Sequence, residues 1–227
     1  MKLFKPLAVA VSILALPISA SAAILQFDFV GEIERTNDGS NVDVASIGSI
    51  AVGDAVSGGF MLDTSSMIGG AGTTTSYATA VSSFHMTVDG LLYNGTGDSS
   101  TTVGNDDMSG SSAPLRDTFL VANYSPSGPI VDGLAPARIQ FALGGTDTSV
   151  LSGTEAPTIE QFFALWAADT IAGNLNFLSF SDGSDARFRA TGLTIDGQGP
   201  AAVPLPAAGL LLMGAIGGLG FARRRKT

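Results

Sequence analysis

The chain has 227 residues, of which 45% are hydrophobic and 14% charged, and this composition fits one globular domain with two membrane-active ends better than a disordered polymer. It contains no cysteine, which excludes thiolate catalysis, cysteine-ligated metal sites and a disulfide framework. The formal net charge is −9, but six of the 11 basic residues lie in the two ends. The body between them therefore sets five arginines against all 20 carboxylates, a formal charge of −15 that argues against nucleic acid as a partner.

Residues 1–22 have the three parts of a secretory signal peptide. Two lysines precede an apolar stretch at residues 7–16, which is too short to span a bilayer comfortably. The small residues Ala20 and Ala22 then form the A-x-A pattern that signal peptidase accepts. We therefore expect signal peptidase to cleave after Ala22, so that the mature chain begins at Ala23.

The start of the body, residues 23–198, reads as β-structure. Apolar residues alternate with polar ones from Leu25 through Phe27 to Phe29, which predicts a half-buried strand. Residues 52–63 then predict a Gly-Asp turn and a short strand, in which the Gly58-Gly59 pair suggests a β-bulge.

A hairpin follows at residues 84–93. Residues 84–88 alternate, and Asp89-Gly90 is typical of a type I′ turn that leads into a second strand. The alternation places His85, the only histidine, on the solvent side of the sheet. Further strands are predicted, with turn-forming stretches between them, at residues 118–124, 138–143, 174–181 and 186–195.

One segment predicts a short helix, at residues 158–168. Thr158 with Gln161 three residues later is a capping-box pattern, and the residues between are good helix formers. The residues of one helix face are expected to pack in the core: Ile159, Phe162, Phe163 and Trp166.

Three segments read as connections. Residues 67–76 and 94–112 are rich in glycine, serine, threonine and aspartate, and we expect long, mobile loops there. Residues 199–202 form a linker to the tail. The expected fold class is therefore mainly β, an antiparallel β-sandwich or jelly-roll-like body with one short helix, plus an N-terminal signal peptide and a single C-terminal transmembrane helix.

Catalytic patterns are weak. His85 has no nucleophile motif near it, and the four glutamates have no context that would raise the pKa of one of them for glycoside hydrolysis. We therefore expect the body not to be an enzyme, and a hydrolase is the least favoured alternative.

Calcium is the only metal that the loop carboxylates suggest. The candidates are Asp106, Asp107, Asp182 and Asp185, but none has EF-hand spacing. Local hydrogen bonding of turn residues accounts for the same residues and is the favoured interpretation. We therefore expect no cofactor, with calcium as the alternative.

The tail, residues 203–227, has three distinct parts. An extended hinge with two prolines comes first: Val203, Pro204, Leu205, Pro206 and Ala207. Residues 206–222 would form a helix about 25 Å long, which spans a hydrocarbon core of about 30 Å only with local thinning. The basic end should stay in the cytoplasm as a membrane stop, so that the body faces outward: Arg223, Arg224, Arg225 and Lys226.

These residues resemble the VPLPA-CTERM sorting signal, a relative of the PEP-CTERM signals, and the resemblance is limited to the tail. It implies a Gram-negative source and an exosortase that cleaves at the motif and passes the product to the cell surface or exopolysaccharide matrix. An ordinary membrane anchor is the alternative. Before processing, the chain would lie in the inner membrane with its body in the periplasm.

The expected function is accordingly that of an exported surface or extracellular-matrix protein with a non-enzymatic, structural or adhesive β domain. The alternative is a glycan-binding, lectin-like module, which would need an exposed aromatic platform. Trp166 is expected to be buried, which leaves Tyr77, Tyr93 and Tyr124 besides the phenylalanines. Loss of glycan binding on substitution of Tyr93 or Tyr124 would favour this alternative.

Overall fold

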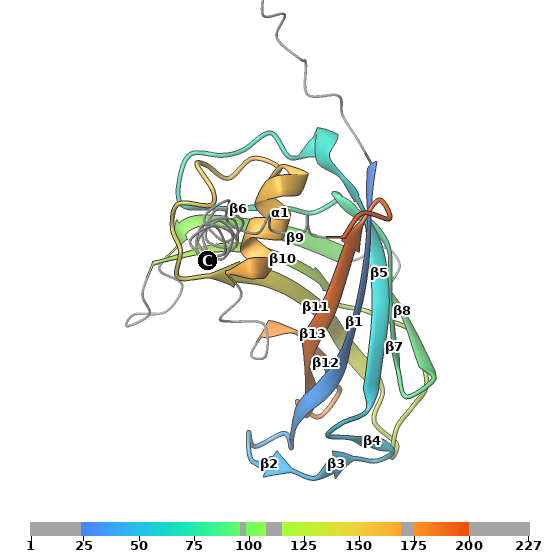
Figure 1. Ribbon diagram of the computed structural model, residues 1–227. Helices are drawn as coiled ribbons and strands as arrows, with labels where there is room; N and C mark the ends of the chain where they lie inside the picture. The colour runs from blue at the N-terminus through green and yellow to red at the C-terminus, as the bar shows by residue number, and fades with distance from the viewer. Residues whose placement is uncertain (1–23, 96–98, 108–114, 169–174, 200–227) are drawn as a thin grey trace, which may run out of the picture.

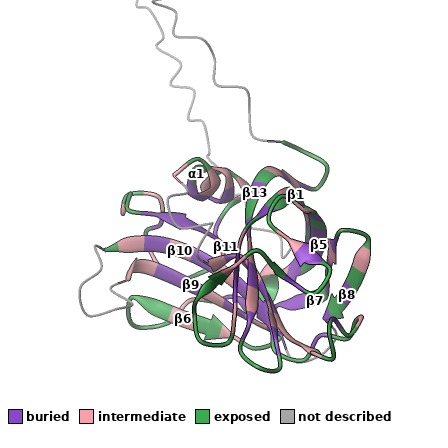
Figure 2. Cartoon of the chain, turned by 90° about the horizontal axis from the view of Figure 1, so that it is seen from below, coloured by how far each residue is buried: buried purple, intermediate pink, exposed green. Residues whose placement is uncertain are grey.

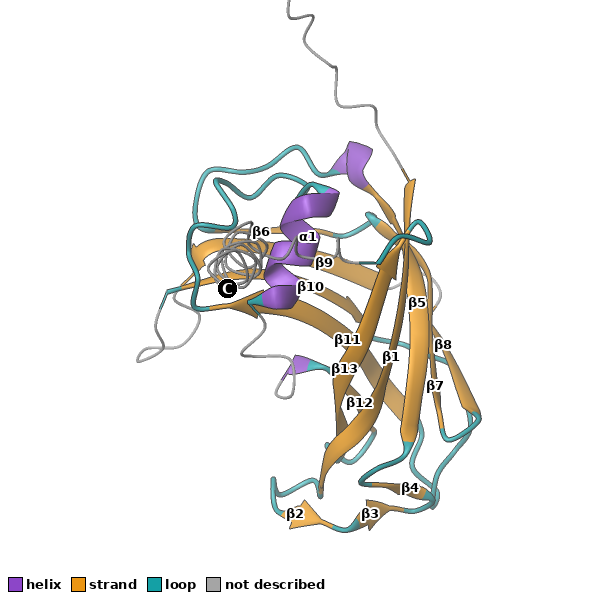
Figure 3. Ribbon diagram, in the orientation of Figure 1, coloured by secondary structure: helices purple, strands orange, loops and turns teal. Residues whose placement is uncertain are grey.

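The computed structural model describes residues 24–95, 99–107, 115–168 and 175–199, which form antiparallel strands and one short α-helix (Figure 3). The elements of this part of the chain are β1 (Ile24–Asn37), β2 (Asp43–Val44), β3 (Ser46–Ile47), β4 (Ile50–Ala51), β5 (Ala55–Asp63), a 3₁₀ turn η1 (Thr64–Ser66), β6 (Thr74–Tyr77), β7 (Val81–Val88), β8 (Leu91–Gly95), β9 (Ser99–Asp107), β10 (Arg116–Asn123), β11 (Pro136–Gly145), α1 (Ile159–Ala167), β12 (Phe177–Phe180) and β13 (Asp185–Ile195).

The described strands pair into one large antiparallel sheet. Its order is β6-β9-β10-β11-β12-β13-β1-β5-β7-β8, with β2 added beside β1, and only β3 and β4 pair separately. The prediction of a mainly β, antiparallel body with one short helix is therefore confirmed. The predicted sandwich or jelly roll would have two separate sheets. Here hydrogen bonding continues through β11 and β12 from the part of the sheet that contains β10 to the part that contains β1, and we call these parts the two arms.

The sheet curls into a half-barrel whose concave face holds the core (Figures 1 and 2). Strands β1 and β10 are four positions apart in the sheet order, which would separate them by about 19 Å if the sheet were flat. The ring centroids of Phe27 on β1 and Phe119 on β10 are nevertheless only 6.1 Å apart. Aromatic contacts across the curl therefore join the two arms.

Helix α1 lies against this aromatic core. The ring of Phe162 meets Phe27 edge-on at 4.8 Å and Phe119 at 4.7 Å. The predicted capping box is confirmed, because the Thr158 side chain accepts from the backbone N–H of Gln161 and the Gln161 side chain accepts from that of Thr158.

The predicted core face of α1 is right only in part. Phe162 is fully buried, whereas Ile159, Phe163 and Trp166 are half-buried and pack against the core. Leu165, which the spacing did not include, is completely buried.

Both segments predicted as long, mobile loops contain strand residues. The prediction was wrong for the described part of residues 94–112, whereas in residues 67–76 only the last three residues are in a strand. Strand β6 lies within residues 67–76 and extends to Tyr77, and β9 occupies most of the described part of residues 94–112. The inward-facing residues of β9 are Ser99, Thr101 and Val103, all buried but small or polar. Threonine suits a strand as well as valine does, but it leaves no hydrophobic alternation in the sequence.

The predicted turn at Asp89-Gly90 is confirmed. Both residues have positive φ, 46° and 80°, as a type I′ turn requires, and they join β7 to β8 at the pair Val88 and Leu91. A register shift does occur next to the Gly58-Gly59 pair, between Gly59 and Met61, but the extra residue lies in β7 and not in β5.

The first and last described strands meet at one end of the sheet (Figure 1). Phe27 near the start of β1 pairs with Ile195 at the end of β13. Gln26 and Asp196 fix this end, since the Gln26 N–H donates to the Asp196 carboxylate and the Asp196 N–H donates to the Gln26 carbonyl, each at 2.8 Å. The body therefore enters and leaves its fold at the same pole.

Within the described ranges, no helix has the length and hydrophobicity needed to cross a membrane. The predicted signal peptide and the predicted transmembrane helix at residues 206–222 both lie outside the described residues.

Candidate functional site

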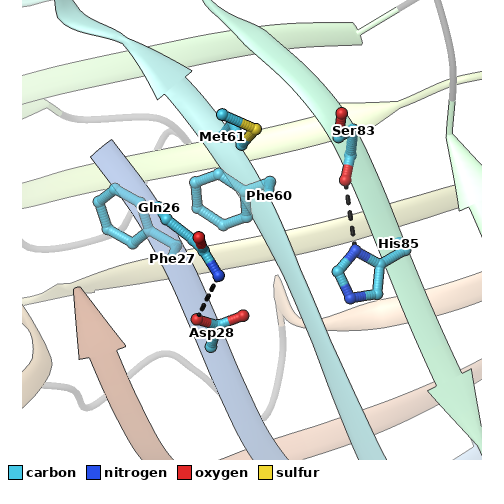
Figure 4. A pocket seen from close by; sticks show the side chains of 7 residues that line it. All are labelled: Gln26, Phe27, Asp28, Phe60, Met61, Ser83 and His85. Carbon is cyan, nitrogen blue, oxygen red and sulfur yellow. Dashed lines mark hydrogen bonds between the residues drawn. The ribbon is translucent and has the colours of Figure 1, made fainter. Parts of the chain in front are cut away.

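A hollow of about 170 Å³ lies on the outer face of β1, β5 and β7, opposite the core (Figure 4). Its polar wall includes Gln26, Asp28, Ser83 and His85, and Met61 adds an apolar side. His85 is exposed on the sheet face, as the alternation predicted.

Gly59 lies on β5 between two residues that line this hollow. It pairs with Asp28 on one side and with His85 on the other, so the three residues form one row across three strands. A Cβ atom on Gly59 would lie 2.8 Å from Oδ1 of Asp28 and 3.2 Å from Cε1 of His85. Both side chains therefore lean over the space that a side chain at residue 59 would fill.

A β-bulge in β7 sets the position of His85. Gly59 pairs with His85 and Met61 with Ser82, so both Ser83 and Phe84 oppose the single residue Phe60. Ser83 has φ of 56°, in the left-handed region, which is costly for a residue other than glycine. Bulges turn backbone groups out of the ladder, and here the Ser83 carbonyl oxygen lies 3.3 Å from Nδ1 of His85.

This contact defines the hydrogen bonding of the imidazole. A carbonyl oxygen only accepts, so in a hydrogen bond here Nδ1 of His85 is the donor, and in that tautomer Nε2 is an acceptor. On the opposite wall, Gln26 Nε2 donates to Oδ2 of Asp28 at 3.0 Å. Oδ1 of Asp28 has no hydrogen bond to any described residue, so Asp28 and His85 each keep one acceptor that is free of hydrogen bonds within the described part of the chain.

The arrangement suits binding better than nucleophilic or two-carboxylate chemistry. Among the described residues no hydrogen bond joins His85 to Asp28 or to the Ser83 hydroxyl, so the contacts of a serine nucleophile with its base are not assembled. Asp28 is the single carboxylate in the wall of the hollow, whereas glycoside hydrolysis uses two.

Two of the calcium candidates, Asp182 and Asp185, are occupied by local contacts. Asp182 accepts from the backbone N–H and the hydroxyl of Ser184, and these bonds, with that from the hydroxyl the larger, hold the pKa of Asp182 below its usual value. Asp185 accepts from Asn37 and pairs with Arg187.

The remaining two candidates, Asp106 and Asp107, lie at the end of β9. Over the ranges that the structure describes, no three histidine or carboxylate side chains converge on a metal position.

The aromatic platform predicted for a glycan-binding module is only partly present. Tyr93 is fully buried, so its proposed role as a platform was wrong. Tyr124 is 45% exposed, but the Arg138 guanidinium covers one face of its ring at 4.7 Å. The Arg138 guanidinium carbon also lies over the Phe177 ring, 5.2 Å from its centroid, so the cation contacts both rings.

Tyr93→Phe is expected to raise the free energy of unfolding by up to about 1 kcal/mol. The Tyr93 hydroxyl is buried and has no hydrogen-bond partner in the described part of the chain, so phenylalanine removes an unsatisfied donor and keeps the ring. Burial also raises the pKa of Tyr93 to about 12.

The same substitution should change the alkaline pH dependence of stability. The unfolded chain loses the tyrosine proton near pH 10 and the folded chain near pH 12, so the stability of the original protein should fall across that interval. Urea unfolding at pH 8 to 11 would check both effects. An equally steep alkaline loss in Tyr93→Phe would contradict the assignment to this residue.

Several predicted site residues lie outside the described residues. These are the cleavage residues Ala20, Ala22 and Ala23, the hinge Val203, Pro204, Leu205, Pro206 and Ala207, and the basic end Arg223, Arg224, Arg225 and Lys226. Sequence reasoning singled out His85 and the Gly58-Gly59 pair but missed Asp28 and Ser83, because only the strand order brings them together.

Comparison with known proteins finds no matching family model, no matching curated protein and no matching solved structure. The assignment of a role therefore depends on the residues of this chain.

Proposed function

We propose that this chain is an exported protein that is sorted through its C-terminal tail to the cell surface or extracellular matrix, where its β domain has a structural or adhesive, non-enzymatic role. The observation that carries the proposal is the order of parts in the tail, a two-proline hinge, an apolar segment of 17 residues and a basic end. A plain anchor has no need of two prolines at its outer edge or of so short a span.

The arrangement of the body supports this route. Strand β1 begins and β13 ends at the same pole of the half-barrel, so both targeting segments would join the body on one side. The rest of the sheet surface, including the hollow over Gly59, would then be free to meet other molecules. The alternative is that the β domain is a glycan-binding module, exported and sorted in the same way.

The double substitution Val203→Ala with Pro206→Ala is expected to abolish tail removal in a host that contains the sorting enzyme. Fractionation and intact mass should show the substituted chain in the inner membrane with its tail complete. Val42→Ala with Pro129→Ala is a matched control in the body, where Val42 is 57% exposed, and it should be processed normally. Unchanged processing of the hinge variant would reject the sorting proposal.

A further inference from the structure

We infer that the hollow over Gly59 is a binding site for one neutral sugar unit, held through two neighbouring hydroxyl groups by Asp28 and His85. The inference deepens the adhesive function proposed above and rests on it for the source of the ligand, a surface or matrix glycan. The chemical class of the ligand is inferred from the residues that line the hollow.

The two walls of the hollow call for a ligand that donates hydrogen bonds. Oδ1 of Asp28 and, in the tautomer with the proton on Nδ1, Nε2 of His85 are both acceptors, and neither has a hydrogen bond to a described residue. Oδ1 of Asp28 and Cε1 of His85, the ring carbon bonded to Nε2, lie 2.8 and 3.2 Å from the Cβ position of Gly59. A pair of neighbouring sugar hydroxyls supplies two donors at short separation, and the Ser83 hydroxyl adds a group that can donate or accept.

The acceptors are held in place before a ligand arrives. Gln26 fixes the other oxygen of the Asp28 carboxylate, and the bulged Ser83 carbonyl fixes the imidazole of His85. The bulge keeps Ser83 in a left-handed conformation, which is unfavourable for serine. Preorganisation of this kind lowers the entropic cost of binding.

The size and charge of the hollow restrict the class of ligand further. A volume of about 170 Å³ is below the range of about 300 to 1,000 Å³ typical of drug-sized ligands, so a single sugar ring suits it better than a longer segment. Met61, 38% exposed, offers an apolar wall for the C–H face of such a ring. Asp28 and the acidic body disfavour uronates and phosphates, and an exposed ion pair is too weak to hold an amine by charge alone.

Ligand-observed NMR with methyl hexopyranosides would test the inference on the mature full-length chain in detergent. We expect at least one neutral hexoside to bind, and Asp28→Asn and His85→Ala each to weaken binding about tenfold or more, because each removes an acceptor. Glu32→Gln on β1 and Thr87→Ala on β7 are matched controls on the same face outside the hollow, and both should bind as the original protein does.

A second experiment removes one hydroxyl from the ligand. A deoxy analogue that lacks one hydroxyl of the bound pair should bind the original protein about tenfold more weakly than the parent hexoside. In the variant that lacks the residue contacting that hydroxyl, Asp28→Asn or His85→Ala, removal of the hydroxyl should weaken binding no further. Binding of an amino sugar or a uronate in place of every neutral hexoside would overturn the inference, as would equal binding by all variants. Absence of glycan binding with normal tail processing would reject the site and leave the sorting proposal intact.

Discussion

Replacing Phe27 by alanine is expected to lower the free energy of unfolding by about 3 to 5 kcal/mol. The ring of Phe27 stacks on Phe60 at 4.6 Å and meets Phe162 edge-on at 4.8 Å. It also lies 6.1 Å from Phe119 on the opposite arm. The substitution therefore opens a cavity where β1, β5, β10 and α1 meet, and it weakens the contacts that hold the sheet curled.

Urea denaturation would measure this loss. Val30→Ala is the control on the same strand, because Val30 is 53% exposed on the outer face, and it should change the stability by less than about 0.5 kcal/mol. Phe27→Leu should fall between the two variants, since it retains part of the buried volume. A loss of stability in Phe27→Ala no larger than that in Val30→Ala would contradict the proposed packing of the two arms.

Asp117→Ala is expected to cost about 3 kcal/mol or more, since hydrogen bonds to a charged group contribute about 1.5 to 3 kcal/mol each. Asp117 is completely buried, and its carboxylate accepts from the backbone N–H of Asp106 at 3.0 Å and from that of Leu151 at 2.7 Å. The residue thus ties the end of β9 and the segment before α1 to β10. Alanine would leave both donors without a partner.

Two comparisons sharpen this experiment. Asp117→Asn keeps one acceptor oxygen, so its loss of stability should be smaller than that of alanine. Asp147→Ala removes an exposed aspartate of the neighbouring turn, whose carboxylate accepts from Ser149 alone among the described residues, and should have a much smaller effect. Equal losses in Asp117→Ala and Asp147→Ala would show that the buried carboxylate does not organise these segments.

The sequence patterns predicted the elements that depend on interactions between residues close together in the chain. The alternation from Leu25 to Phe29, the Asp89-Gly90 turn and the capping box at Thr158 each depend on residues a few positions apart. All three are present in the structure. Strand pairing depends on residues far apart in the chain, such as Phe27 with Ile195, and the sequence alone did not predict it.

The features that the sequence analysis missed all depend on contacts between segments that are far apart in the chain. Strand β9 buries Ser99 and Thr101 in place of large apolar residues, so it has the composition of a loop. The buried position of Asp117 depends on donors supplied by two other segments, and the hollow over Gly59 depends on a bulge in the neighbouring strand. These features require the tertiary fold, and a single sequence does not encode them in its spacing.

The central proposal is that the tail sorts this protein outward, and intact mass with cell fractionation tests it most directly. The protein would be expressed in a host with its sorting enzyme and in one without it. The proposal predicts a mature form that begins at Ala23, ends near Val203 to Ala207 and lies outside the inner membrane only when the enzyme is present. A chain that keeps its full tail in the inner membrane of both hosts would contradict it and would identify a simple anchored periplasmic protein.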